Sequence, residues 1–171
     1  DEFLNKHLLL QGSISEPSLA YWLPSLLPEK MPIMLAASSP VRDWLSFSGI
    51  KPLSRRCFGF RGASGIDGTL SLGMGLALAI GPMLLVTGDL ALLHDSNGWL
   101  LTHPKRIPLV VLLIDNGGGG IFQQLYIKTS PKEKFYELFA MPQAVDQMVL
   151  AEAHGVPHRQ IARLEDLAFA L

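Results

Sequence analysis

Two stretches of this sequence combine oxygen-bearing side chains with glycines at a spacing that suits metal chemistry. Asp89 follows an apolar segment at 83–87, and Asn116, 27 positions later, lies between a second apolar segment at 109–114 and four glycines at 117–120. A carboxylate, a carboxamide oxygen and a backbone carbonyl are hard oxygen ligands, which Mg²⁺ accepts together with phosphate oxygens and water. Glycines let the backbone approach a diphosphate closely and present N–H groups to it. The pattern therefore predicts a site for a divalent metal and a diphosphate.

The elements around these residues predict how they are brought together. Residues 83–87 (MLLVT) and 109–114 (LVVLLI) are continuously apolar, which is typical of parallel strands covered on both faces. Residues 90–103 between them are predicted to form a helix. A strand–helix–strand unit is right-handed and sets its strand ends side by side, and ligands bind beyond those carboxyl ends. We therefore expect Asp89 and Asn116 to face one another there.

The rest of the chain repeats the alternation of strand and helix. Further strands are predicted at 32–37, 57–60 and 159–162, and helices at 19–27, 41–47, 66–80, 132–139, 144–154 and from 164 onward. The fold class that we predict is α/β, with three layers, a mostly parallel sheet and helices on both faces. We expect residues 1–171 to form a single domain, with residues 1–30 as a lead-in segment and helix, and the sheet to lack its last strand.

Composition and charge exclude several classes of protein. Hydrophobic residues make up 49% of the chain and charged residues 17%, which argues against intrinsic disorder. The 14 basic and 15 acidic residues leave no positive excess for binding nucleic acid. The 21 residues from 68 to 88 carry no charge, but Gly81-Pro82 divides them into a helix and a strand. No membrane span is therefore predicted.

Cysteine content and apolar surface give two further expectations. A single cysteine, Cys57, cannot form an internal disulfide, which favours a reducing compartment, and we expect a cytoplasmic protein. We interpret Cys57 as a buried small apolar residue. The apolar residues 72–80 and the low charge content predict a face covered by a partner, so we expect a homo-oligomer.

The glycine-rich site also has a plainer interpretation, which stays open at this point. Asp89 would be a helix N-cap and the glycines a loop, although four consecutive glycines lose much chain entropy on folding. Gly73-x-Gly75 lacks the third glycine of a dinucleotide fingerprint and lies within a predicted helix, where close packing accounts for it better. For His94-Asp95, capping or packing is favoured over proton transfer.

The chain resembles one family of enzymes that use thiamine diphosphate (ThDP). Gly88-Asp89 with Asn116 resembles the general ThDP-binding motif. Six segments are similar to one family in particular: ISEPSLA (14–20), SSPVRDW (38–44), RGASGIDG (61–68), GDLALLHDSNG (88–98), GGGIF (118–122) and EKFYELFAMPQ (133–143). That family is MenD, 2-succinyl-5-enolpyruvyl-6-hydroxy-3-cyclohexene-1-carboxylate synthase. The resemblance runs nearly end to end but covers only the family's C-terminal, diphosphate-binding domain.

The resemblance implies roles for individual residues in binding ThDP with Mg²⁺ or Mn²⁺. Asp89 and Asn116 match metal ligands, with the Gly118 carbonyl as a third. Ile66 matches the apolar residue that holds the cofactor in its bent, reactive conformation. The other positions that match the cofactor site are Gly88, Leu90, Gly119, Ile121, Phe122 and Leu125, the last three as the pocket wall near the thiazolium.

The resemblance also implies a substrate site. Arg42 and Arg61 match arginines that recognise substrate carboxylates, which planar guanidinium groups bind in a bidentate manner. Ser38 matches a polar contact beside them. Two positions depart from the family pattern. Ala37 stands where the family usually has Asn, and Asp115-Asn116 stands where the family usually has Asn-Asn.

The activity implied by the family is ThDP- and Mg²⁺-dependent decarboxylation of 2-oxoglutarate. The succinyl-semialdehyde carbanion equivalent is then added to isochorismate, in menaquinone or phylloquinone biosynthesis. The resemblance includes no N-terminal pyrimidine-binding domain, which supplies the activating glutamate in such enzymes, so we expect the chain alone to be inactive. Two alternatives stay open. Another ThDP-dependent 2-oxo acid lyase would have no need of two carboxylate-binding arginines, and a non-catalytic α/β assembly module would show no metal-dependent binding of ThDP.

Overall fold

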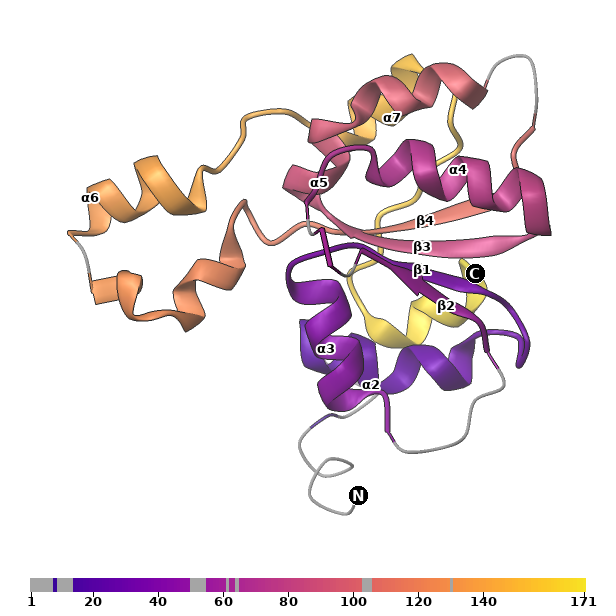
Figure 1. The fold of residues 1–171 in the computed structure, drawn as a ribbon, viewed down its shortest axis with the longest axis horizontal. Coiled ribbons are helices and arrows are strands. Elements are labelled where there is room, and N and C mark those ends of the chain that lie inside the picture. The colour runs from indigo at the N-terminus through magenta and orange to yellow at the C-terminus, as the bar shows by residue number, and fades with distance from the viewer. Residues whose placement is uncertain are drawn as a thin grey trace.

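A parallel sheet forms the centre of the computed structural model, which describes residues 8, 14–49, 55–60, 62–63, 65–102, 106–129 and 131–171. Within these residues the strands are β1 (Ile33–Leu35), β2 (Cys57–Gly59), β3 (Met83–Gly88) and β4 (Leu109–Ile114). They pair in parallel in the order β2-β1-β3-β4. Because these strands all run the same way, their carboxyl ends lie along one edge of the sheet (Figure 1).

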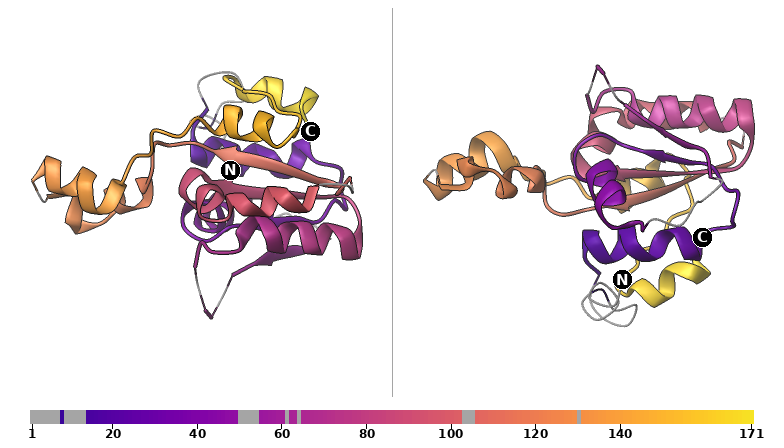
Figure 2. Two further views of the ribbon diagram at one scale, coloured as in Figure 1. Left: turned by 90° about the horizontal axis from the view of Figure 1, so that it is seen from above. Right: turned by 60° about the horizontal axis from the view of Figure 1, so that its bottom comes forward.

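Helices cover both faces of the sheet, which confirms the predicted three-layer α/β fold (Figures 1 and 2). One face carries α2 (Glu16–Leu26), α3 (Ser39–Phe47) and a 3₁₀ helix at Leu164–Phe169, and the other carries α4 (Thr69–Ile80), α5 (Asp89–His94) and a 3₁₀ helix at Ser96–Thr102. The strand residues alternate between the two cores. Ile33 and Leu84 belong to the first core, Met34 and Leu85 to the second, and all four are 0% exposed. A strand buried on both faces must therefore be apolar at every position.

A capping box fixes the start of α2, of which Glu16 is the first residue. The Ser15 hydroxyl accepts a hydrogen bond from the Ser18 N–H at 3.2 Å, and the Ser18 hydroxyl accepts one from the Ser15 N–H at 2.9 Å. Pro17, in the first turn, lacks an N–H that would otherwise need a partner. Leu23 of the same helix is 1% exposed in the core. The position of Glu16 relative to the sheet is therefore well determined.

Residues 120–129 and 131–146 form an arm that projects from the body of the molecule (Figures 1 and 2). The arm contains 3₁₀ helices at Gly120–Gln124 and Tyr126–Thr129, α6 (Lys132–Phe135) and a π-helical turn at Tyr136–Ala140. A small aromatic cluster holds the arm together. The ring centroids of Phe122 and Phe139 are 5.7 Å apart, and Phe135 stacks on Phe139 at 6.2 Å.

Several predicted helices have different limits in the structure, among them the two that flank β3. The helix predicted at 66–80 begins at Thr69, because Gly68 adopts a left-handed conformation (φ 65°) that an α-helix does not contain. A turn at 65–68, which carries Ile66, therefore precedes α4. The helix predicted at 90–103 ends as α5 at His94 and continues only as the 3₁₀ helix from Ser96.

Three predictions about strands and burial are wrong. Residues 159–162 form no strand: beside them only Arg163 makes an isolated bridge, and among the described residues the sheet ends at β4. β4 was expected to be covered on both faces. As an edge strand it is only partly buried, and Val110 is 36% exposed. Cys57 is exposed rather than buried, because it lies on β2, the strand at the opposite edge of the sheet.

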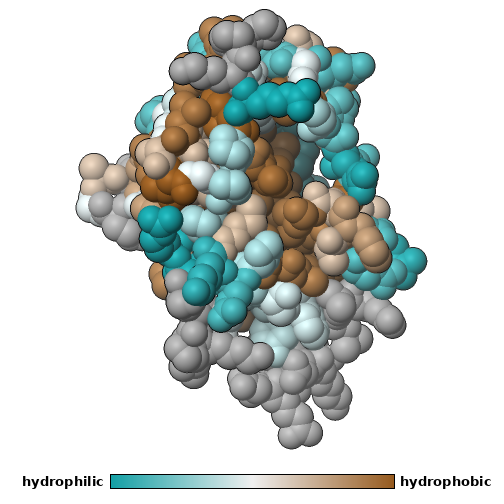
Figure 3. Space-filling view, turned by 90° about the vertical axis from the view of Figure 1, so that its right-hand side faces the viewer, coloured by the Kyte–Doolittle hydropathy of each residue, from teal (hydrophilic) through white to brown (hydrophobic). Residues whose placement is uncertain are grey.

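Apolar side chains reach the surface in several places. Leu72 and Leu78 of α4 are 44% and 55% exposed, so the apolar segment predicted at 72–80 does present leucines to the outside. At the end of the molecule opposite the arm, apolar side chains gather in patches between polar ones (Figure 3). Among the described residues, none of the helices has the length and apolar character needed to cross a bilayer.

Candidate functional site

The structure brings Asp89 and the glycine run together at the carboxyl edge of the sheet. Gly88 of β3 is paired with Ile114 of β4, so Asp89 leaves the sheet beside the end of β4. The Gly118 N–H donates to Asp89 Oδ2 at 2.6 Å, and the Leu90 N–H donates to Oδ1 at 2.8 Å. The two carboxylate oxygens of Asp89 therefore join the first turn of α5 to the glycine run.

The surroundings of Asp89 disfavour the charged form of its carboxyl group. Asp89 is 8% exposed, and this burial raises its pKa, while the N–H groups of Leu90 and Gly118 lower it and the neighbouring Asp115 raises it. Among the described residues, no lysine or arginine forms an ion pair with Asp89. A buried carboxylate with a second acidic group beside it fits a divalent cation, which would compensate the charge of both.

Asn116, the second predicted metal ligand, is held through its amide nitrogen. Asn116 Nδ2 donates to Glu16 Oε1 at 2.8 Å, a contact between residues 100 positions apart. Gly120 lies against the same carboxamide, since a Cβ at Gly120 would be 2.7 Å from Nδ2 and 3.1 Å from Oδ1. Within the described part of the chain, Oδ1 receives no hydrogen bond, so this oxygen can serve as a ligand.

The glycine run has a structural role that the sequence did not reveal. Gly118 (φ 115°) and Gly119 lie against the segment by which the arm returns to the body. The Gly119 N–H donates to the Ala140 carbonyl at 2.5 Å. A Cβ at Gly118 would collide with the Ala140 carbonyl, and a Cβ at Gly119 with the Phe139 carbonyl. Close contacts with the backbone of the returning segment therefore leave no room for a side chain at Gly118 or Gly119. The Gly118 carbonyl accepts from the Gly120 N–H at 2.9 Å and keeps a second lone pair.

Ile66 lies in the turn at 65–68, which contacts on both sides hold in place. The Thr69 hydroxyl, which is fully buried, donates to the Ile66 carbonyl at 2.9 Å. His94 Nδ1, from the end of α5, is 3.2 Å from Asp67 Oδ1, and both side chains are mostly exposed. Such an exposed pair contributes little stability by itself.

Asp95 caps α4 from another element of the structure. Gly68, the N-cap residue of α4, has no side chain to offer. Asp95 instead accepts hydrogen bonds from the Ser71 N–H at 2.6 Å and from the Ser71 hydroxyl at 3.0 Å. The prediction that His94-Asp95 serves capping or packing is therefore confirmed for Asp95.

We expect Asp95→Ala to lower the free energy of unfolding by about 1–2 kcal/mol, the usual effect of losing a helix cap. Amide exchange at Ser71 should become faster, because its N–H loses its partner. Ser71→Ala removes only the hydroxyl bond and should have a milder effect. Urea denaturation and hydrogen exchange measure both, and an Asp95→Ala protein as stable as the wild type would contradict this role.

Ser38 and Arg42 lie at the start of α3, which follows β1 at the same edge of the sheet. Ser38 has a positive φ (75°), and its side chain does not cap the helix. Non-glycine residues in such conformations cluster at functional sites. Arg42 is exposed and donates from Nη1 to the Ser38 carbonyl at 2.7 Å, which directs its guanidinium toward the start of α3. Ala37 offers no polar side-chain group here, and Arg61 lies outside the described residues.

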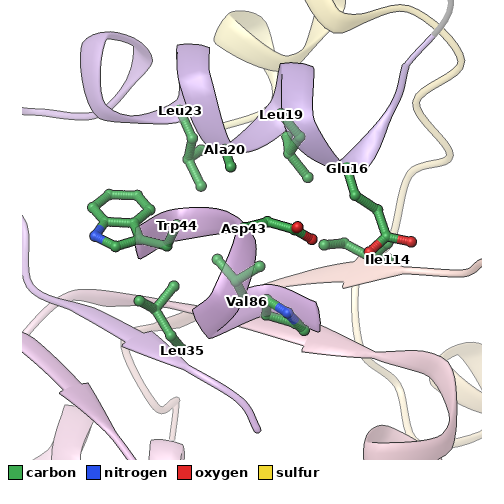
Figure 4. A pocket seen from close by; sticks show the side chains of 10 residues that line it. Glu16, Leu19, Ala20, Leu23, Leu35, Asp43, Trp44, Val86 and Ile114 are labelled. Carbon is green, nitrogen blue, oxygen red and sulfur yellow. The ribbon is translucent and has the colours of Figure 1, made fainter. Parts of the chain in front are cut away.

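Glu16 and Asp43 form an acidic pair at a small pocket between α2 and α3 (Figure 4). Leu23 and Trp44 contribute to its apolar walls. Burial first, and then the neighbouring Glu16, raises the pKa of Asp43 from its ordinary 3.8 to about 6, against the opposing effect of Arg42. Asp43 Oδ2 is buried without a hydrogen-bond partner.

Asp43 should make the folded state less stable as the pH rises. Its folded pKa of about 6 lies above the ordinary value of 3.8, so its contribution is fully present below the ordinary value and is lost as the pH rises through about 6. Allowing for partial solvent screening, we expect Asp43→Asn to be roughly 1–2 kcal/mol more stable than the wild type at about pH 7.5, and similar to it at about pH 4. Urea denaturation at the two pH values tests this, and a difference that does not vary with pH would contradict it.

The residues predicted to line the cofactor pocket lie in the arm. Ile121 and Phe122 are partly buried there, whereas Leu125 is 52% exposed. The arm carries these residues outward from the sheet edge at which Asp89 and Gly118 meet (Figure 1).

Sequence reasoning missed Gln147, the first residue of α7 (Gln147–Ala153). Its Nε2 donates to the Asp89 backbone carbonyl at 3.3 Å, and its Oε1 is buried without a hydrogen-bond partner. Gly118, before the arm, and Gln147, after it, therefore both contact Asp89. The contact spans 58 positions, and no local pattern could have indicated it.

Comparison with known proteins decides the family. Residues 46–171 match the family described as thiamine pyrophosphate enzyme, C-terminal TPP binding domain, in which thiamine pyrophosphate is another name for ThDP. The chain belongs to this family. The match includes Asp89, Asn116 and Gly118. Glu16 and Arg42 come before its first residue.

Close relatives of this TPP-binding domain share one name. The chain is 70% identical over 170 residues to the 2-succinyl-5-enolpyruvyl-6-hydroxy-3-cyclohexene-1-carboxylate synthase of Prochlorococcus marinus (strain MIT 9313), a match that covers 99% of this chain and 29% of that protein. It is 66% identical over 171 residues to the protein of the same name from Synechococcus sp. (strain CC9605), covering 99% of this chain and 30% of that protein. The resemblance to this synthase family is therefore confirmed, and the chain spans less than a third of these relatives.

Solved structures of low sequence identity share the fold of the domain. Benzoylformate decarboxylase from Polynucleobacter necessarius superimposes with a TM-score of 0.69 at 17% identity, over 92% of this chain and 30% of that one. The thiamine diphosphate-dependent 4-hydroxybenzoylformate decarboxylase of Rhodococcus jostii RHA1 gives a TM-score of 0.67 at 20% identity, over 92% and 29%.

Proposed function

We propose that this TPP-binding domain is part of a ThDP- and Mg²⁺-dependent synthase that decarboxylates 2-oxoglutarate. The remaining four-carbon unit is added to isochorismate, in menaquinone or phylloquinone biosynthesis. The observation that carries the proposal is the bond from the Gly118 N–H to the buried Asp89 carboxylate, at the edge where Gly88 pairs with Ile114. The name of a relative that is 70% identical over nearly the whole chain supports the choice of synthase.

The metal and the diphosphate would be held at this edge. Asp89, Asn116 and the Gly118 carbonyl are the proposed ligands of Mg²⁺ or Mn²⁺, and the cation would offset the cost of the buried Asp89 charge. The backbone at Gly88, Leu90 and Gly119 is the proposed contact for the diphosphate. When bound, ThDP supplies the carbanion-stabilising chemistry, while the protein supplies binding, orientation and electrostatics.

Other residues would shape the cofactor and select the substrates. Ile66, in a turn whose backbone the buried Thr69 hydroxyl anchors, is the proposed apolar support of the cofactor. Ile121, Phe122 and Leu125, in the arm that leaves this edge, are the proposed apolar wall near the thiazolium of the cofactor. Arg42 and Arg61 would bind substrate carboxylates, and Ser38 would contribute a polar contact beside them.

The proposal extends to the rest of the enzyme. The catalytic unit includes a pyrimidine-binding domain that supplies the activating acid, so residues 1–171, as a single cofactor domain, have no turnover alone. The exposed Leu72 and Leu78 of α4 support a homo-oligomer, since large exposed apolar patches rarely persist on monomers. The reducing environment favoured by the lone Cys57 supports a cytoplasmic location.

Arg42→Lys in the complete protein tests the substrate assignment. Lysine keeps the charge but loses the planar fork that binds a carboxylate at two points. We expect kcat/KM for 2-oxoglutarate to fall about 10-fold, the effect of a difference near 1.4 kcal/mol, while the affinity for ThDP is unchanged. Pyruvate lacks the second carboxylate, so an equal loss with pyruvate would contradict the assignment and favour another ThDP-dependent lyase.

A further inference from the structure

We propose that Glu16 is a positioning residue of the metal site, which orients the Asn116 carboxamide so that its oxygen faces the metal. This inference rests on the proposed function and deepens it, because it gives α2 a part in a site otherwise built from the ends of β3 and β4.

The chemistry of the two groups determines the orientation. The two ends of a carboxamide have nearly the same shape, but only the oxygen can bind a cation, and a half-turn of the side chain exchanges them. An ionised carboxylate only accepts hydrogen bonds. Glu16 Oε1, at 2.8 Å, therefore binds the Asn116 amide nitrogen and would repel the oxygen.

Both neighbours of the Asn116 carboxamide are themselves fixed. Glu16 is held at the first turn of α2 by the Ser15–Ser18 capping box, and the helix N-terminus favours its negative charge. Gly120 closes another side, because a Cβ there would lie 2.7–3.1 Å from the atoms of the carboxamide. The amide group is thus held by a charged acceptor at its nitrogen and by backbone at its side.

The experiment measures the binding of Mn²⁺ to the complete protein in the presence of ThDP, by electron paramagnetic resonance of free Mn²⁺. We expect Glu16→Ala to weaken Mn²⁺ binding by about 10-fold or more, the usual effect of losing a group that orients a metal ligand. Glu16→Gln should give an intermediate loss, because glutamine can present either end of its own amide to Asn116. Excess Mn²⁺ should restore turnover in Glu16→Ala without a change in the KM for 2-oxoglutarate.

Two further variants separate orientation from other effects of the substitution. Ser15→Ala breaks the capping box of α2 but keeps the Glu16 carboxylate, so it should lower Tm and leave Mn²⁺ affinity unchanged. Gly120→Ala changes no charge but displaces the Asn116 carboxamide, so it should weaken Mn²⁺ binding as Glu16→Ala does.

The outcomes distinguish this role from the proposed function. A wild-type protein that binds no Mn²⁺ in the presence of ThDP would refute the proposed function and this role with it. Wild-type binding together with unchanged affinity in Glu16→Ala would refute the role of Glu16 alone. Equal weakening by Ser15→Ala would also overturn it, because α2 packing and not the carboxylate would then be responsible.

Discussion

Asp89→Ala in the complete protein should abolish the Mg²⁺-dependent binding of ThDP. Asp89 is the charged member of the proposed ligand set, and its loss should weaken binding by more than the roughly 10–100-fold seen when an outer-shell group is removed. The substitution also leaves the buried Gly118 N–H without its acceptor, which costs about 1–3 kcal/mol. Calorimetric titration of ThDP with and without Mg²⁺ measures the first effect, and urea denaturation the second.

Asp89→Asn separates the charge from the hydrogen bonds. Asparagine can still accept from the Gly118 or Leu90 N–H, but it lacks the charge that burial disfavours in Asp89. We expect the metal-free protein to be at least as stable as the wild type, while the Mg²⁺ dependence of ThDP binding is lost. Unchanged ThDP affinity and unchanged Mg²⁺ dependence in both variants would show that the metal assignment is wrong.

Gly118→Ala should displace the arm from the cofactor site. The new Cβ would collide with the Ala140 carbonyl, and Gly118 has φ 115°, which alanine adopts only with strain. We expect a loss of about 2–3 kcal/mol at the root of the arm and at least a 10-fold lower kcat/KM, because Ile121 and Phe122 would be misplaced. Hydrogen exchange in β3 should stay unchanged.

Gly117→Ala is the matched control for this variant. Gly117 also has a positive φ (79°), but a Cβ there would meet nothing within 4 Å. Its substitution reports backbone strain alone, which we expect to be about 1–2 kcal/mol. Equal effects of the two variants on turnover would mean that the contact with Ala140 has no functional part.

Sequence patterns predicted the elements that carry strong local signals. The continuous apolar runs at 83–87 and 109–114 appear as β3 and β4, and the polar residues that follow them meet at one edge. The run at 159–162 failed as a strand because pairing is not a local property, and in the described structure pairing there is limited to an isolated bridge at Arg163. The strand–helix–strand unit predicted that Asp89 and Asn116 face one another at this edge. In the structure Asp89 contacts the Gly118 N–H, two residues beyond Asn116, and the Asn116 amide contacts Glu16.

Long-range contacts of the site could not be predicted in this way. Glu16 and Asn116 are 100 positions apart, and Gln147 and Asp89 are 58 apart. Each contact depends on how separate elements dock, for which a single sequence contains no periodic signal. The glycine run was interpreted as an approach to diphosphate, and its approach to Ala140 became visible only when the path of the arm was known.

The most direct test of the proposed function is product formation by the complete protein from 2-oxoglutarate and isochorismate, with ThDP and Mg²⁺ present together or omitted singly. We expect turnover only in the complete mixture, and none from the 171-residue chain alone until the rest of the protein is added in trans. Turnover that does not depend on ThDP and Mg²⁺, or turnover by this chain alone, would contradict its assignment as the cofactor domain of a synthase.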